Sequence, residues 1–328
     1  MTLVTMTNST LDQSSGFPVI LIVFIVLQQL VFITALLGNS LVIFIFISKL
    51  KLKTNTNKFV VNLAIADMLT GIVAGIQVFY FMYPSIANNM TVCFLRYLLI
   101  SYTTLVSQLT VLFTALDRYI AICHPHHYAK ILTTNATIIL SLFPWIFCLF
   151  FVALPFWGLH VWSPGFPCEY LFLFHRGFYL ASSLIVYSFS MITFVMYILI
   201  LKAAWRFYSR VAPVSGGSVN NQQTAKSKNM DRDVRSAKVT GIVTLAFSFC
   251  WLPFTSFPFR KGIGIDQTTI TELTVMNWLV FLGLLNSIIN PFIYAWKRRD
   301  FIKECKKTFR CLKNNNQEET VVHVTSQP

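Results

Sequence analysis

The sequence predicts an all-α membrane protein, a bundle of seven transmembrane helices with a short amphipathic membrane-surface helix after the last span. Of its 328 residues, 55% are hydrophobic and only 12% are charged, which is too apolar for an ordinary soluble domain. Seven long stretches carry almost no charge, and each reaches the roughly 20 residues that a helix needs to cross a bilayer core. Basic residues gather on one side of these stretches.

The seven stretches define the expected spans. Six contain no charged residue, and the remaining one, 59–95, is interrupted only by Asp67. The six uncharged stretches are 13–48, 97–116, 131–159, 177–201, 239–259 and 273–296.

Lysine and arginine placement predicts which side of the membrane each loop occupies. With the N-terminus outside, 22 of the 26 basic residues fall on the inner side, as the positive-inside rule requires. The four exceptions are Arg96, Arg176, Arg260 and Lys261. The net charge of +14 therefore reflects topology and attraction to membrane lipids, and we expect no nucleic-acid partner.

Two glycosylation motifs agree with this orientation. Asn8 in "NST" and Asn89 in "NMT" both fall on the outer side, where the acceptor asparagine is modified. No basic segment precedes the first span, so we expect that span to serve as its own insertion signal. The expected location is the plasma membrane, with the N-terminus extracellular and the C-terminus cytoplasmic.

The segment after the last span has the pattern of a helix lying on the inner membrane surface. Phe301, Ile302, Cys305, Phe309 and Leu312 recur at spacings near three to four, among basic residues. Cys305 and Cys311 are palmitoylation candidates there. The expected regions are an extracellular N-terminus at 1–17, the seven-helix domain at 18–296, the amphipathic juxtamembrane helix at 297–313 and a disordered cytoplasmic tail at 314–328.

Polar residues within the spans indicate function, because they are costly in lipid. Asp67 is the acid placed well inside a span, and two interpretations are open. It is either a structural carboxylate bonded to neighbouring helices or part of a cation site, which needs further oxygen ligands. The candidate ligands at comparable depth are Asn39, Ser107, Asn286, Ser287 and Asn290.

Six fragments, in order, carry a family resemblance. They are "GNSLVIF", "NLAIADML", "ALDRYIAICHP", Trp145, "FCWLP" and "NSIINPFIY". Across about 260 residues they closely resemble the rhodopsin-like (class A) G-protein-coupled receptors. The resemblance implies an extracellular ligand, a heterotrimeric G protein as partner, with arrestin and receptor kinases, and no enzymatic activity.

The resemblance also implies roles for individual residues. Asp117 and Arg118 look like the family's cytoplasmic switch, in which Asp233 on the sixth helix also holds the arginine; the plainer alternative is an interfacial stop signal. Cys93 and Cys168 share the oxidising side, are able to pair, and resemble the family disulfide. The other switch residues are Tyr119, Tyr197 and Tyr294. The residues resembling the family's allosteric sodium site are Asp67, Asn39, Ser107, Asn286, Ser287 and Asn290.

The positions that match the family's ligand pocket are nearly all neutral. Ile100 stands where amine receptors have an aspartate, so an amine ligand paired there is disfavoured. Phe189 replaces a common proline, a feature of the lipid, cannabinoid and melanocortin group. The expected ligand is uncharged or lipid-like. The expected pocket residues are Ile100, Ser101, Thr104, Glu169, Trp251, Phe254, Thr255, Pro258, Val280 and Leu284.

Several alternatives remain open. The ligand is alternatively a peptide or a molecule with a polar head group, bound by charged or polar residues at the outer opening of the pocket: Glu169, His175, Arg176 and Lys261. An adenosine-like ligand is another alternative, because "NPFIYA" resembles the adenosine receptors. An odorant receptor is a further alternative within the fold, and a transporter or channel is a remote one. His126 stands where the family commonly has a bulky apolar residue that inserts into the G protein, which leaves the class of G protein open.

Overall fold

The computed structural model describes residues 19–49, 54–83, 85, 88–165, 167–211, 221–265, 268–299, 301–308 and 310. Within these helices the side chains at 20, 49, 207–211, 221–230, 232, 233 and 270 lie outside the description.

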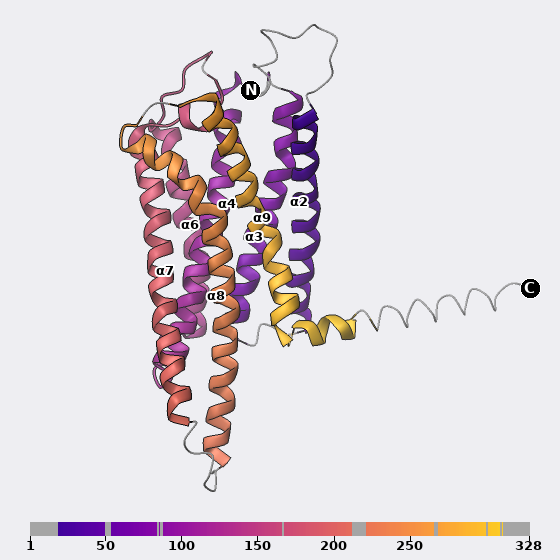
Figure 1. Cartoon of the computed structure of the whole chain (residues 1–328), viewed down its shortest axis with the longest axis vertical. Helices are drawn as coiled ribbons and strands as arrows, with labels where there is room; N and C mark the ends of the chain where they lie inside the picture. Colours follow the sequence, from indigo (N-terminus) through magenta and orange to yellow (C-terminus); the bar gives the residue numbers. More distant parts are fainter. Residues whose placement is uncertain are drawn as a thin grey trace, which may run out of the picture.

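Seven long helices form one bundle, as the sequence predicts (Figure 1). Each is long and apolar enough to span a membrane. Short helical turns, α5 (Tyr128–Ile131) and η4 (Tyr170–Phe172), lie in the loops. The long helices are α2 (Val19–Phe44, continued by the π turn η1, Ile45–Lys49), α3 (Asn55–Met82), α4 (Met90–Cys123), α6 (Thr134–Ala153, continued by η3, Leu154–Trp157), α7 (Arg176–Val211), α8 (Asn221–Gly262) and α9 (Ile270–Lys297).

Helix α4 is the central element of the bundle, since it contacts α3, α6, α7 and α8. Three of its buried threonines, Thr103, Thr110 and Thr114, donate their hydroxyl protons to carbonyls of the preceding turn, as Thr110 does to the Val106 carbonyl (2.8 Å). Asn62 of α3 donates to Thr110 Oγ1 (3.1 Å) and accepts from Trp145 Nε1 of α6 (2.8 Å). These bonds satisfy polar groups that lipid cannot, and they fix three helices relative to one another.

The expected boundary between the second and third spans is wrong. The charge-poor stretch 59–95 runs through the end of α3 at Met82 and into α4, which begins at Met90. Arg96 therefore lies inside α4 rather than before it. The charge is tolerated there because Arg96 bonds to Gln77 of α3 and packs on aromatic rings.

A short helix follows α9, turns sideways from it and passes the inner end of α2 (Figure 1). Phe301 is 2% exposed and stacks on Phe46, with ring centroids 5.8 Å apart. Arg298 donates to Asn57 Oδ1 (3.0 Å), and its guanidinium carbon lies over the Phe46 ring, 4.8 Å from the ring centre. The expected amphipathic helix is confirmed over these residues, whereas Phe309 and Leu312 lie outside the described residues.

Candidate ligand-binding and signalling sites

A cavity of about 100 Å³ lies between the outer halves of six helices. That is space for several water molecules, at roughly 10–15 Å³ of such volume for each. Its exposed surface is mostly apolar, as is typical of small-molecule sites, although ten of the 22 lining residues, not counting the tyrosines, carry a polar side chain. The lining residues are Phe24, Gln28, Gln77, Phe81, Arg96, Tyr97, Ile100, Ser101, Thr104, Leu105, Gln108, Tyr170, Ser182, Ser183, Val186, Phe247, Trp251, Phe254, Thr255, Pro258, Asn277 and Val280.

Eight of the ten residues expected in the pocket line this cavity, and two do not. Leu284 is fully buried and packs in a cluster with Val31 and Ala74, away from the cavity. Glu169 is 4% exposed and lies beside the Tyr97 hydroxyl. The eight that line it are Ile100, Ser101, Thr104, Trp251, Phe254, Thr255, Pro258 and Val280.

Sequence reasoning missed the polar end of the cavity. Gln28, Gln77, Arg96 and Asn277 come from four different helices and all line it. Helical periodicity carried a signal for one of them, because Arg96 precedes Ile100 by four residues and so shares its face. The other three are neutral amides, whose convergence depends on how the helices pack.

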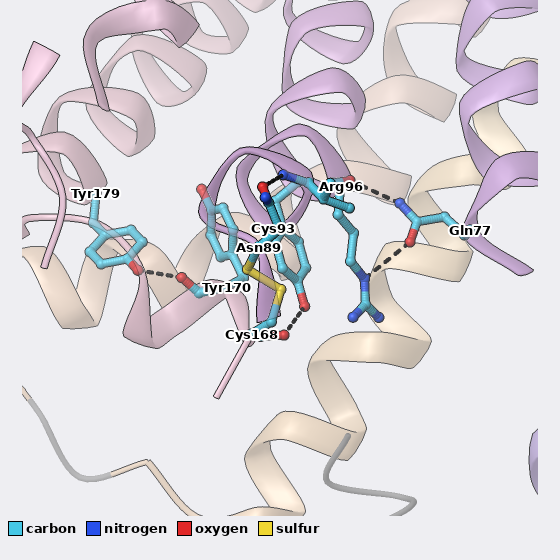
Figure 2. Close-up of a disulfide and its surroundings, with 9 residues drawn as sticks. Gln77, Asn89, Cys93, Arg96, Cys168, Tyr170 and Tyr179 are labelled. Atoms are coloured by element: carbon cyan, nitrogen blue, oxygen red, sulfur yellow. Dashed lines mark hydrogen bonds between the residues drawn. A yellow bond between two sulfur atoms is a disulfide. The ribbon is translucent and has the colours of Figure 1, made fainter. Parts of the chain in front are cut away.

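The expected disulfide between Cys93 and Cys168 is present (Figure 2). It ties the first turn of α4 to the loop that runs beside the cavity. The Tyr97 hydroxyl donates to the Cys168 carbonyl (3.0 Å). The Tyr179 hydroxyl of α7 donates to the Tyr170 carbonyl on the other side of the loop. Burial raises the pKa of Tyr170 to about 12, so this cavity residue remains a neutral phenol.

The same loop folds back on itself in a short antiparallel pairing. Val161 N donates to the Leu173 carbonyl (2.9 Å), and His175 N donates to the Leu159 carbonyl (3.1 Å). Backbone, disulfide and tyrosine bonds together therefore hold the loop in one position at the outer end of the bundle.

Asp67 is fully buried below the cavity and is held by three neighbours. Asn290 Nδ2 donates to its Oδ2 (2.6 Å), and the hydroxyls of Ser107 and Ser287 donate to its Oδ1 (3.2 and 3.5 Å). Asn39 joins the group through the Ser287 carbonyl (2.9 Å). Hydrogen bonds thus connect five of the six expected residues. The sixth, Asn286, precedes Ser287 in α9 and is also buried.

This group fits a hard cation. The Oδ1 atoms of Asn39, Asn286 and Asn290 are buried and have no hydrogen-bond partner among the described residues. Surplus carbonyl oxygens near a carboxylate are the donor set that a hard cation prefers. No cluster of three His, Cys, Asp or Glu side chains occurs in the described part of the chain, so a thiolate or imidazole metal centre is not indicated there.

Asp117 and Arg118 lie at the inner end of α4, and both are buried. Arg118 donates to Asp117 Oδ2 from Nε (2.9 Å) and Nη2 (2.6 Å). Thr56 of α3 donates to the same oxygen (2.7 Å), while Tyr128 of α5 donates to Oδ1 (2.7 Å). The carboxylate is therefore bonded on both oxygens, by residues from two other elements that sequence reasoning did not identify.

The remaining switch residues are less closely grouped. Tyr119 and Tyr197 belong to a cluster around Ile122, whereas Tyr294 packs in a different cluster with Val243. The Asp233 backbone belongs to α8, but its side chain lies outside the described residues, and so does the expected contact with Arg118.

The candidate modification sites are partly described. Asn89 is exposed at the start of α4, where its side chain accepts from Val92 N (3.2 Å). Cys305 is a half-buried free thiol in the helix after α9. Asn8 and Cys311 lie outside the described residues. His126 is exposed in the loop between α4 and α5.

Comparison with known proteins gives two findings. The sequence pattern of the family described as "7 transmembrane receptor (rhodopsin family)" matches residues 38–294. The octopamine receptor beta-1R of Drosophila melanogaster is 28% identical over 326 residues, covering 86% of this chain. This chain spans about 60% of the length of that relative.

Proposed function

This chain belongs to the rhodopsin family of seven-transmembrane receptors, and we propose that it carries a signal from an extracellular ligand to a heterotrimeric G protein. The family is one of receptors and not of enzymes. The observation that carries the proposal is the alignment of three features along the bundle: the outer cavity, the buried Asp67 group and the Asp117–Arg118 pair at the inner end. We place the N-terminus outside the cell and the inner end in the cytoplasm, with arrestin and receptor kinases as further partners.

The ligand that the cavity favours is lipid-like or otherwise largely apolar. Trp251, Phe254, Phe247 and Leu105 give it a broad apolar surface. Burying such a ligand displaces water from apolar walls, which is the main source of affinity in sites of this kind. This supports the lipid and cannabinoid group over the adenosine group. Adenosine receptors usually have an asparagine on the sixth helix at the position of Pro258, so this residue is a mismatch to them.

A biogenic amine is the second candidate, because the Drosophila relative is an octopamine receptor. An amine is cationic at neutral pH, and burying a cation without a counter-charge is costly. Ile100 occupies the expected position of that counter-charge, and no aspartate or glutamate is among the described residues that line the cavity. We therefore rank the amine second.

We propose that Asp67 and its neighbours hold a sodium ion. The buried amide oxygens without a partner support this, and a bound cation would stabilise the packing of α3, α4 and α9 around the carboxylate. The residues of this site are Asp67, Asn39, Ser107, Asn286, Ser287 and Asn290.

The test is activation of G-protein biosensors in cells, one biosensor for each G-protein class. Wild type is compared with Arg118→Ala at matched surface level, without ligand and with panels of uncharged lipids, acidic lipids, amines including octopamine, nucleosides and peptides. A response that Arg118→Ala abolishes supports the proposal and identifies the transducer. Silence of the wild type in every channel with every panel would contradict it.

A further inference from the structure

We propose that the ligand of the outer cavity carries an acidic head group, a carboxylate or a phosphate, which Arg96 binds. The inference rests on the proposed receptor function and specifies the ligand class of that same cavity. The inference starts from Arg96, a buried cation that we expected outside the spans and that lies within α4.

Arg96 is held rigidly at the polar end of the cavity. Its side chain is buried, and the residue as a whole is 8% exposed. Nε donates to Gln77 Oε1 (3.2 Å), and Gln77 Nε2 donates back to the Arg96 carbonyl (2.8 Å). Figure 2 shows the terminal guanidinium nitrogens pointing away from Gln77. A guanidinium fixed in this way has its remaining donors pre-organised for a planar or tetrahedral anion.

Aromatic rings support the guanidinium but do not neutralise it. The rings of Tyr80, Phe81 and Tyr97 lie 5.4, 5.3 and 5.1 Å from its central carbon. Such contacts attract the cation through the negative face of the ring, but none of these rings carries a negative charge. A buried charge without a counter-ion is costly even after relaxation. The rings therefore position the guanidinium without supplying a counter-ion.

No ion pair neutralises Arg96 in the described part of the chain. Ion pairs there join Arg118 to Asp117 and Arg260 to Glu272, and the described lining of the cavity contains no acid. The nearby Glu169 interacts with the Tyr97 hydroxyl instead. Arg96 is thus a buried cation on the wall of a ligand-sized space, and an anion that enters this space completes its coordination.

Other polar groups of the cavity lining are able to assist Arg96. Gln28 is 3% exposed, lines the cavity, and its Oε1 has no hydrogen-bond partner among the described residues. Because no described residue bonds this oxygen, the amide is able to turn its Nε2 toward an anion. Thr104 Oγ1, about two turns further along α4, is also buried without a partner among the described residues and is able to donate.

The rest of the cavity selects an apolar body for the ligand. Leu105 of α4 and Phe247, Trp251 and Phe254 of α8 line it, and on α4 Ile100 lies between Arg96 and Leu105. An acidic amphiphile matches both ends at once. A cationic amine would instead meet Arg96, a like charge, in a low-dielectric site.

The experiment measures binding to the full-length receptor in phosphatidylcholine nanodiscs, at neutral pH and without a G protein. The probes share one tail and differ in the head group: octanoate, octyl phosphate, octan-1-ol and octylamine. Ligand-induced shifts of the unfolding temperature over a concentration series give the dissociation constants. Because no G protein is needed, failed coupling leaves this readout intact, and the two proposals fail separately.

We expect wild type to bind octanoate or octyl phosphate roughly 10- to 100-fold more tightly than octan-1-ol, and octylamine more weakly still. Arg96→Gln should remove this preference while leaving octan-1-ol binding unchanged. Arg96→Lys, which keeps the charge, should retain part of it. Arg176→Gln, the matched change at an arginine outside the cavity lining, should keep the preference.

Three results would overturn the proposal. One is equal binding of acid and alcohol by wild type, or no binding of either acid up to millimolar concentration. Another is a preference for octylamine. The third is a gain of acid binding of tenfold or more in Asp12→Asn or Asp266→Asn, because it would mean that an acid outside the described residues already neutralises Arg96. If Arg96→Gln does not fold, the wild-type comparison of the four probes still decides.

Discussion

Replacing Tyr128 by phenylalanine removes a hydroxyl that donates to the buried Asp117 carboxylate over 2.7 Å. Burial and the neighbouring carboxylate raise the pKa of Tyr128 well above its ordinary value, so the hydroxyl remains a proton donor at neutral pH. A hydrogen bond to a charged group contributes roughly 1.5–3 kcal/mol. Tyr128 is half-buried, so water replaces part of the loss, and we expect destabilisation of about 1–2 kcal/mol.

The assay is thermal unfolding of the purified receptor in nanodiscs. Because the unfolding entropy grows with chain length, the unfolding temperature of a protein of this size falls by roughly 1–2 °C per kcal/mol. The control is Tyr83→Phe, which removes a hydroxyl from a tyrosine that is 52% exposed. An unchanged unfolding temperature in Tyr128→Phe, or an equal fall in the control, would refute the assigned role.

A double-mutant cycle sharpens this prediction. Thr56 donates to the other carboxylate oxygen, Oδ2 (2.7 Å), so Thr56→Val removes a bond to the same charge from α3. Residues that share one partner couple by roughly 0.5–3 kcal/mol. The combined variant should therefore depart from additivity by at least about 0.5 kcal/mol. Additive losses would show that the two hydroxyls are not coupled through Asp117.

Three further predictions concern packing and the cation site. Gly283→Ala places a methyl group 2.7 Å from the Trp251 ring, so we expect about 1–3 kcal/mol of destabilisation, measured by thermal unfolding. Phe301→Ala empties the site stacked against Phe46 and should cost about 3–5 kcal/mol by the same measurement. Sodium chloride should raise the unfolding temperature more than potassium chloride does, and Asp67→Asn should abolish this difference, because a cation that binds only the folded state stabilises it.

Matched changes serve as controls for these three. Gly177→Ala meets its nearest neighbour at 3.5 Å, an ordinary contact, and should be tolerated. Ile302→Ala, next to Phe301 but half-exposed, should cost much less. A sodium effect that survives Asp67→Asn would place the ion elsewhere, and a large loss in either alanine control would show that the measurement reports general damage to the helix.

The seven helices could be predicted from the sequence, because lipid excludes charge and the charge-poor stretches are long. The exact ends could not, since charge inside a helix is tolerated where it finds partners. Arg96 illustrates this, because Gln77, which bonds it, is 19 positions away in the chain. A charge-free interval therefore identifies a span without fixing its ends.

The residues of the pocket could be predicted only in part. Family resemblance and helical periodicity predicted the positions on α4 and α8 that face the cavity. Leu284, one turn beyond Val280 on α9, shares its helical face, yet it packs on α2 and α3 instead. How far along a helix the residues of one face still border the cavity depends on the angle at which the helices cross, which the local sequence does not encode. Thr56 and Tyr128 escaped prediction for a similar reason, as only tertiary packing brings them to Asp117.

The fastened outer loop has a consequence for rates. It is held at the Cys93–Cys168 disulfide, at Tyr97 and at Tyr179, and its Tyr170 borders the cavity. A barrier that a ligand crosses in both directions slows association and dissociation by the same factor. Loosening the loop, for example by Tyr179→Phe, should therefore shorten residence time and speed association together, with little change in equilibrium affinity. The loop would then determine how long a signal lasts, while the cavity below it determines which molecule starts it.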